Sequence, residues 1–503
     1  MQSTGRWWAL AALNLGVLVV GLDGTVLSVA LPTLAGALDA SQSDLVWFSS
    51  GYLLVLAAAV LPVGVLGDRF GRKKVLLTSL VGFGVGSAIC AYAPSVGVFL
   101  GGRALQGLSG AGITVMALSA LVVLFPAAER PRAVAVYQAA NFLSLLLGPL
   151  LGGWMLDRFW WGWVFLLNVP VVLVALGVGV LLIPESRAAE RPGLDPLGTV
   201  TSALGLVLTI GGVIRAGQHG WDDAGTLALL GGGLVALVGF AGWERRGAAR
   251  PLIDRALFGS ATFLRGSALV AVAGLAMIGT LFTLPQFFQD VRGAEPIHSG
   301  LSLLPLIAGT VLGAGLSAPL GRTAGVRPTV AAGFLVLAAG LLLGTTTDVD
   351  SGSWWIGAWT CVLGVGTGMV LTAATSAALS GLDAEHSGVG SAVVQAFNKT
   401  SGPFGAAISG SIVVAVYQDR LETSGVTEAA RRGLADGLDV ASRTGSDAVH
   451  DAVLGAFVAG FRTSLLVSAA IAVAGAIAAA VLLPRRDTTD HPARREHMDA
   501  AHG

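Results

Sequence analysis

Three ionisable side chains lie deep inside long apolar runs of the chain: Asp23, Arg103 and Lys399. An ionised side chain at the centre of a membrane helix costs roughly 2.5 to 3.5 kcal/mol on insertion scales, so such groups usually face a cavity and mark a substrate or proton path. A carboxyl group whose burial changes can bind and release a proton. We therefore predict proton coupling at these three residues, with Asp23 loaded outside and unloaded inside. The alternative is a structural aspartate that is held by Arg103 or Lys399 and does not titrate.

Helical spacing groups these cations with polar or small neighbours. Arg103 and Gln106 share one face of a helix, as do Lys399, Gln395 and Asn398. An arginine near a helix end can instead snorkel to the headgroups, which is the alternative for Arg103. We predict that polar side chains from several helices line a central cavity and contact the substrate: Gln106, Gln138, Asn141, Gln395 and Asn398.

Lys399 bears on the kind of substrate. A lysine in the cavity would balance the charge of the site, titrate itself or disfavour cationic substrates. Since the spans offer one carboxylate beside two cations, neutral, weakly basic or anionic amphiphiles are better candidates than dications.

The elements that position these residues are membrane helices. The chain has 503 residues, of which 54% are hydrophobic and 12% charged, against about 25% charged in soluble domains. Apolar runs of about 20 residues predict spans. We predict an all-α integral membrane protein with fourteen transmembrane helices, at 7–34, 45–66, 74–93, 96–125, 133–156, 163–183, 197–215, 224–243, 263–288, 299–320, 328–346, 354–380, 389–417 and 459–483.

The distribution of cations predicts the orientation. With a cytoplasmic N-terminus, 20 of the 30 Lys and Arg fall in cytoplasmic segments, 8 in outer segments and 2 within spans. The positive-inside rule therefore favours cytoplasmic N- and C-termini. The Gly-, Ala- and Arg-rich composition points to a bacterial plasma membrane as the location.

Several classes of function are excluded or disfavoured. A formal net charge of zero is unlike that of nucleic-acid binders, which need a surplus of Lys and Arg. Cys90 and Cys361 fall in apolar runs, where core packing is their usual role, so we expect neither a disulfide nor a metal site. No GxxxxGK[ST] loop is present, and the spans hold no cluster of His, Cys or carboxylates that would serve an enzyme. We expect no enzyme activity and no cofactor beyond the proton gradient.

Two internal echoes indicate duplicated halves. "YQAANFLSLLLGPLLGG" in the fifth predicted helix and "VQAFNKTSGPFGAA" in the thirteenth share QAxN and a following Gly-Pro. "GVLGDRFGRKK" has a weaker partner in "PLGRTAGVRP". Parallel halves of six helices are the layout of many secondary transporters. The predicted domains are a first six-helix bundle (1–183), two inserted helices (184–260), a second bundle (261–483, with an outer loop at about 418–458) and a disordered cytoplasmic tail (484–503).

The inner-loop stretch "GVLGDRFGRKKVL" resembles a signature of the major facilitator superfamily, and the chain as a whole is similar to the fourteen-helix drug and proton antiporter branch of that superfamily. The resemblance implies an inner gate, in which Asp68 faces the start of a helix in the other half, near residues 387–390. Its motif residues here are Gly64, Asp68, Arg69, Gly71, Arg72 and Lys73. An ordinary positive-inside loop is the alternative.

Three further stretches carry the resemblance. "FLGGRALQGLSGAG" is similar to the fourth-helix motif of the family, and "GLDGTVLSVALP" to the first-helix signature of the branch, with Ser28 where asparagine is usual. "LGPLLGG" resembles a motif that the antiporters carry, here Gly148, Pro149, Gly152 and Gly153. A close-packing helix without directional meaning is the alternative for this last motif.

The resemblance implies a proton-coupled exporter of amphipathic drugs or antibiotics that works by alternating access and confers resistance. We expect small amphipathic substrates, protons and the lipid bilayer as its partners, no nucleic acid, and a monomer. The alternatives are an exporter of a lipid or an endogenous metabolite on the same fold, an importer, which "LGPLLGG" argues against, and a membrane sensor that does not transport.

Overall fold

A computed structural model describes residues 3–40, 42–188, 195–246, 260–380, 382, 387–423, 428–431 and 433–484, and these are helical apart from short connections. The helices are α1 (Ser3–Ala37), α2 (Gln42–Phe70), α3 (Arg72–Ala91), α4 (Val96–Leu124), α5 (Arg130–Leu156), α6 (Trp163–Leu166), α7 (Asn168–Leu182), α8 (Pro196–His219), α9 (Ala224–Arg246), α11 (Ala261–Gln286), the π-helix η1 (Phe287–Val291), α12 (Pro296–Leu301), α13 (Leu304–Thr323), α14 (Val326–Gly344), α15 (Ser353–Ser380), α16 (Ser387–Thr423), α17 (Glu428–Arg431), α18 (Leu434–Thr444) and α19 (Asp447–Leu482).

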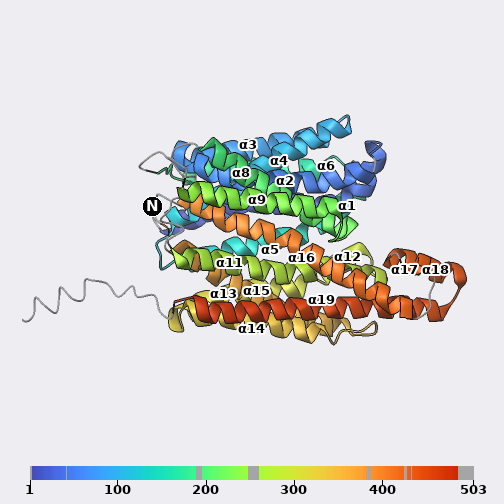
Figure 1. The fold of residues 1–503 in the computed structure, drawn as a ribbon. Coiled ribbons are helices and arrows are strands. Elements are labelled where there is room, and N and C mark those ends of the chain that lie inside the picture. The colour runs from blue at the N-terminus through green and yellow to red at the C-terminus, as the bar shows by residue number, and fades with distance from the viewer. Residues whose placement is uncertain are drawn as a thin grey trace, which may run out of the picture.

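The predicted helix count is confirmed, because 14 helical segments of the described chain are long and apolar enough to cross a membrane. They run side by side along one direction (Figure 1). The protein is therefore a multi-pass membrane protein. We call the end of the bundle where α1 begins and α19 finishes the terminal end, and the opposite end, which carries α17 and α18, the loop end (Figure 1).

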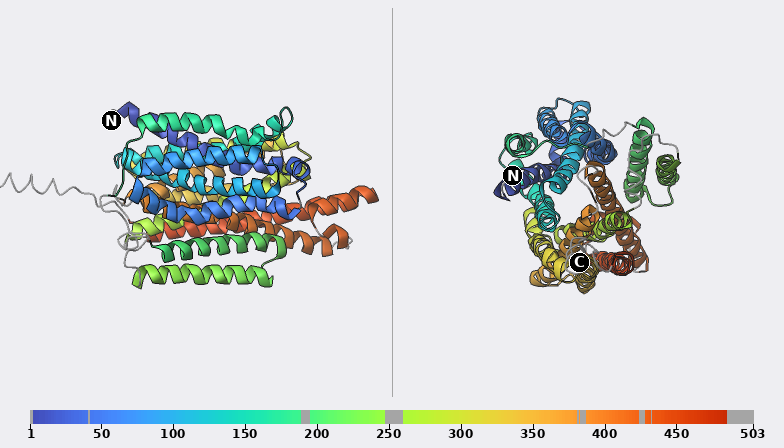
Figure 2. Two further views of the ribbon diagram at one scale, coloured as in Figure 1. Left: turned by 90° about the horizontal axis from the view of Figure 1, so that it is seen from above. Right: turned by 90° about the vertical axis from the view of Figure 1, so that its left-hand side faces the viewer.

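Two large hydrophobic cores organise the bundle. The first is built mainly by α1 to α5 and α7, and the second mainly by α11 and η1 together with α13 to α16, α18 and α19. We call these the first and second bundles. The end-on view shows α8 and α9 as a separate pair to one side of both bundles (Figure 2, right). Of this pair, α8 packs against α2 of the first bundle and α16 of the second.

Local sequence sets where several helices begin. The side chains of Ser95 and Ser260 cap α4 and α11 by accepting a hydrogen bond from a backbone N–H three residues on. Gly71 precedes α3 with φ +114°, and Gly325 precedes α14 with φ +94°. Glycine tolerates this region without the steric cost that a Cβ brings. The two loops that resemble each other in sequence therefore also share a backbone conformation.

The predicted outer loop is largely helical. α16 continues to Thr423 and α19 already begins at Asp447, twelve residues before the apolar window that predicted it. At 1.5 Å per residue each of these helices is about 55 Å long, well beyond an apolar layer of about 30 Å, so its polar end projects at the loop end. Hydropathy finds the part of a helix inside the membrane and misses this extension. Of the predicted tail, residues 485–503 lie outside the described residues.

Candidate functional site: a cavity, a buried ion pair and a closed end

A cavity of about 650 Å³ lies between the two bundles. Pockets that hold drug-sized ligands span about 300 to 1,000 Å³. Helices α1, α2, α5, α8, α11, α15 and α16 contribute to its wall. Its polar lining is Thr25, Ser50, Tyr52, Gln138, Asn141, Ser144, Asn398, Lys399 and Ser401. The larger apolar side chains in the wall are Leu53, Leu56, Phe142, Ile210, Ile214, Met277, Ile278, Phe282 and Leu371.

The structure brings some of the predicted polar residues to this cavity and not others. Gln138, Asn141 and Asn398 line it. Gln395 lies outside the lining, because its side-chain amide donates to the Tyr137 hydroxyl at 2.6 Å and, at 3.4 Å, to a backbone carbonyl of α4. Gln106 is also outside, since it belongs to the buried network described next.

Asp23 and Arg103 form an ion pair that is removed from solvent, with both residues at most 1% exposed. Gln106 donates to Asp23 Oδ1 at 2.8 Å, and Asn168 donates to the same oxygen at 3.0 Å. The Arg103 guanidinium also donates to the backbone carbonyl of Phe48 at 3.1 Å. A buried charge is tolerated when it is paired and hydrogen-bonded, and both charges here are. Neither residue lines the cavity.

Tyr52 stands between this pair and the cavity. Its ring lies 4.3 Å from the Arg103 guanidinium carbon, and its hydroxyl donates to the Val20 carbonyl at 3.2 Å. Tyr52 also lines the cavity. A cation against an aromatic face is attracted by the ring quadrupole. One side chain therefore contacts both the ion pair and the space where a substrate would lie.

At the terminal end, Asp68 lies where the resemblance places it. Its two carboxylate oxygens accept hydrogen bonds from the backbone N–H groups of Gly388, at 3.0 Å, and Val389, at 2.9 Å, in the first turn of α16. The N–H groups of a first helical turn lack intrahelical partners and carry the positive end of the helix dipole, so a carboxylate is favoured there. Arg72 holds the same carboxylate at 2.6 Å, and a Cβ on Gly64 would approach the Ala392 Cβ to 2.7 Å.

More bonds join the two bundles at this end. The hydroxyls of Ser119 and Ser387 lie 3.0 Å apart, and the Arg130 guanidinium donates to the Leu379 carbonyl at 3.3 Å. Arg322 of α13 donates to the Ala128 carbonyl at 2.8 Å. The terminal end of the cavity is therefore closed by contacts between the bundles.

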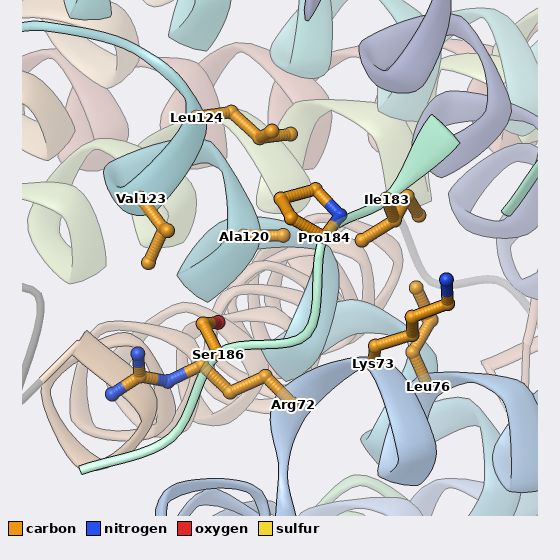
Figure 3. A pocket seen from close by; sticks show the side chains of 9 residues that line it. All are labelled: Arg72, Lys73, Leu76, Ala120, Val123, Leu124, Ile183, Pro184 and Ser186. Carbon is orange, nitrogen blue, oxygen red and sulfur yellow. The ribbon is translucent and has the colours of Figure 1, made fainter. Parts of the chain in front are cut away.

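The segment that follows α7, residues 183–188, lies over the gate motif (Figure 3). Arg72 N–H donates to the Ser186 carbonyl at 2.9 Å, and Lys73 N–H donates to Glu185 Oε1 at 3.1 Å. Figure 3 shows the side chains of Arg72 and Lys73 pointing in opposite directions, and Lys73 Nζ donates to the Val180 carbonyl at 2.7 Å. Arg69, the other cation of the motif, lies 5.5 Å from the centre of the Phe70 ring. The three cations of the motif thus have different partners: Arg72 pairs with Asp68, Lys73 bonds to α7 and to the segment after it, and Arg69 lies beside Phe70.

The glycines of the fifth-helix motif set the distance between α5 and α1. A Cβ on Gly148 would collide with the Thr25 hydroxyl, and a Cβ on Gly152 would lie 2.5 Å from Val26. A Cβ on Gly153 would meet no atom within 4 Å, and Pro149 lies inside the helix. Small residues permit close helix packing in membranes. Two of the three motif glycines therefore place the face of α1 that lines the cavity.

Sequence reasoning missed three residues of the buried site: Tyr52, Ser87 and Asn168. Ser87 Oγ accepts from the amides of Gln106 at 2.9 Å and Asn168 at 3.2 Å. Asn168 ends the stretch "WWGWVFLLN", an isolated amide in an apolar run and thus a usable signal. Ser87 and Tyr52 gave none, because serines and tyrosines are common near helix ends and interfaces.

The chain is similar in sequence and in fold to several known proteins. A family model described as Major Facilitator Superfamily matches residues 13–406. The tetracenomycin C resistance and export protein of Streptomyces glaucescens is 34% identical over 417 residues, which cover 82% of this chain and 77% of that protein. The multidrug efflux pump LfrA of Mycolicibacterium smegmatis is 33% identical over 453 residues, 88% of each chain. The solved structure of the proton:xylose symporter XylE superposes with a TM-score of 0.62 over 95% of both chains at 16% identity, a likeness of fold alone.

Proposed function

Since the chain belongs to the major facilitator superfamily, we propose that it is a proton-coupled exporter of amphipathic drugs or antibiotics that confers resistance on a bacterium. Its relatives include a tetracenomycin C exporter and a multidrug efflux pump, which favours export over a sensor without transport. The proposal places the terminal end in the cytoplasm, as the cation distribution predicts.

The observation that carries the proposal is the position of the cavity relative to the closed end. The lining residues Ser50, Phe282 and Gly410 lie nearer the loop end of their helices, while the bonds of Asp68 to α16 join the bundles at the terminal end. We assign this arrangement to the outward-facing state of an alternating-access cycle. Rocking of the two bundles would break the Asp68 contacts and open the cavity to the cytoplasm.

Proton coupling is assigned to the buried pair. Protonation of Asp23 would remove its negative charge and weaken its ion pair with Arg103. The guanidinium would keep its hydrogen bonds to the Phe48 carbonyl and to Gln106. Tyr52 contacts Arg103 and lines the cavity, so a shift of the guanidinium would reach the substrate through this ring. Binding of the substrate and protonation of Asp23 would thereby be mutually exclusive, because both act through the contact between Tyr52 and Arg103. Lys399, unlike Asp23 and Arg103, lines the cavity, and it is the alternative proton carrier.

The available energy is adequate. One charge that moves through about 150 mV yields about 3.5 kcal/mol, at roughly 2.3 kcal/mol per 100 mV. At about 1.4 kcal/mol per decade this sustains a gradient of a few hundred-fold for a neutral substrate.

The test is transport in proteoliposomes with an imposed pH gradient, for a panel of antibiotics and fluorescent dyes. Wild-type protein is expected to accumulate substrate and to dissipate the gradient together with it. Asp23→Asn is expected to lose gradient-driven accumulation while keeping equilibrium binding. Asp350→Asn, an exposed carboxylate between α14 and α15, is the matched control and should transport normally.

Two results would overturn the assignment. Transport by Asp23→Asn with unchanged pH dependence would make Asp23 structural and move coupling to Lys399 or to a group of the gate motif. If no compound of the panel is transported but a cellular lipid or metabolite is, the result would favour an exporter of an endogenous compound.

A further inference from the structure

Of the residues that the structure describes in the cavity lining, Lys399 is the single cation. Lys399 lies on the face of α16 that also presents Asn398, Gly402 and Ala406 to the same space. Among the described residues that line the cavity, no aspartate or glutamate is present. Within the part of the chain that the structure describes, the Lys399 ammonium has no ion-pair partner.

Asp23 and Asp223, carboxylates of α1 and of the turn between α8 and α9, already have partners of their own. Both oxygens of Asp23 are occupied, one by Arg103 and the other by the amides of Gln106 and Asn168. Asp223 accepts from the guanidinium of Arg215, from the N–H of Thr226 and from its hydroxyl. Among the residues that the structure describes, no carboxylate therefore compensates the positive charge of Lys399.

An ammonium in an apolar cavity is poorly solvated, and its attraction to an anion is stronger there than in water. An anionic group that enters the cavity gains this attraction and offsets the desolvation of the lysine. A cation that enters meets repulsion instead. The amide of Asn398, beside Lys399, can donate a further hydrogen bond to an acid oxygen.

The rest of the wall suits the apolar body of such a molecule. Phe142, Ile210, Met277 and Phe282 approach the cavity from three helices. The repeated sequences place Phe142 at the position of α5 that corresponds to Lys399 of α16. The α5 wall of the cavity thus carries the aromatic Phe142 at the position where the α16 wall carries the cationic Lys399.

From this geometry we propose that Lys399 binds the acidic group of an anionic amphipathic substrate, so that the protein selects organic acids over organic cations of the same size. The proposal rests on the export function proposed above and adds the substrate class. Lys399 contacts substrate directly, while Asn398 and the apolar wall orient it.

The test is equilibrium binding without any proton gradient, which separates recognition from coupling. The probes are two xanthene dyes of similar size, fluorescein as the acid and rhodamine 6G as the cation, titrated by fluorescence polarisation against purified protein in a non-ionic detergent. Wild-type protein is expected to bind fluorescein more tightly. Lys399→Gln should weaken fluorescein at least tenfold, with rhodamine 6G changed less than threefold or bound more tightly. Lys399→Arg should stay within about threefold of wild type for both dyes.

Arg443→Gln is the matched control, since it also removes one cation but lies exposed on α18, paired with Asp439 far from the cavity lining. It should bind both dyes as wild type does. Fluorescein affinity of Lys399→Gln within twofold of wild type would overturn the proposal, and so would equal weakening of both dyes or a wild-type preference for rhodamine 6G. Loss of gradient-driven transport with this selectivity intact would overturn only the proposed coupling.

Discussion

The two ionised sites within the membrane differ in how their charge is balanced. Asp23 and Arg103, on α1 and α4 of the first bundle, are paired and satisfied by further hydrogen bonds, and solvent does not reach them. Lys399, on α16 of the second bundle, faces a cavity and has no ion-pair partner among the residues that the structure describes. A balanced site holds helices together, while an unbalanced one attracts a ligand that completes it.

The repeated helices sharpen this contrast. Gln138 and Asn141 of α5 both line the cavity, whereas of their counterparts on α16 only Asn398 does, because Gln395 is bonded to Tyr137. Sequence symmetry between halves therefore does not produce a symmetric cavity. The difference arises from packing at the terminal end, where α16 is bonded to the first bundle through Asp68.

The largest expected effect is on the balanced pair. Arg103→Met should lower the free energy of unfolding by about 3 to 5 kcal/mol, because it leaves the buried Asp23 carboxylate without its cation. Denaturant unfolding in detergent measures this. The double variant Asp23→Asn/Arg103→Met should lose less than the single one, and a loss below about 1 kcal/mol in Arg103→Met would contradict the description of a balanced buried pair.

An intermediate effect is expected where α5 positions α1. Gly148→Ala places a methyl group against Thr25 and should destabilise by about 1 to 3 kcal/mol. Gly153→Ala is the control on the same helix, since its methyl group meets open space and alanine favours helix by up to about 1 kcal/mol. Equal losses in the two variants would show that close packing of α1 and α5 is not what these glycines provide.

A smaller effect is expected at the unbalanced site. Lys399→Phe introduces the residue that α5 has at the corresponding position, Phe142, and removes a cation that lines the cavity. Since this leaves no buried partner unpaired in the described part of the chain, the free energy of unfolding should change by less than about 1.5 kcal/mol, the limit for substitutions that keep side-chain volume. The same unfolding assay applies. A loss as large as that of Arg103→Met would mean that Lys399 is balanced within the protein.

The smallest effect is expected at the partly exposed ion pair between α8 and α9, in which Asp223 lies outside the spans. The hydrogen bond from Arg215, helped by the N–H of Thr226, lowers the pKa of Asp223 to about 2. Because the folded pKa lies below the unfolded value of about 3.9, the stabilisation is present above about pH 4 and is lost as pH falls through about 2. Asp223→Asn should therefore flatten the dependence of stability on pH over this range, while Asp222→Asn should not. Identical profiles of stability against pH for the two variants would show that the Arg215–Asp223 pair does not cause this pH dependence.

Much of the fold and part of the site could be predicted from sequence. The gate motif was found together with its partner helix, because the loop resembles a family signature and that resemblance implies the contact of Asp68 with the start of α16. The lining role of Lys399 followed from a single helical face. Gln106 and Gln395 were expected in the cavity and lie elsewhere, since polarity alone does not say whether an amide faces a cavity or a neighbouring helix.

The sequence by itself determined the number of membrane helices, the depth of the three intramembrane charges and the position of the gate loop, because hydropathy and local motifs act over a few turns of chain. Only the tertiary structure decided which charges meet. Asp23 pairs with Arg103, eighty residues away, and Tyr52 separates that pair from the cavity, through the rotation of α1, α2 and α4 about their axes. That rotation is fixed by close contacts such as Gly148 against Thr25, which involve residues far apart in sequence.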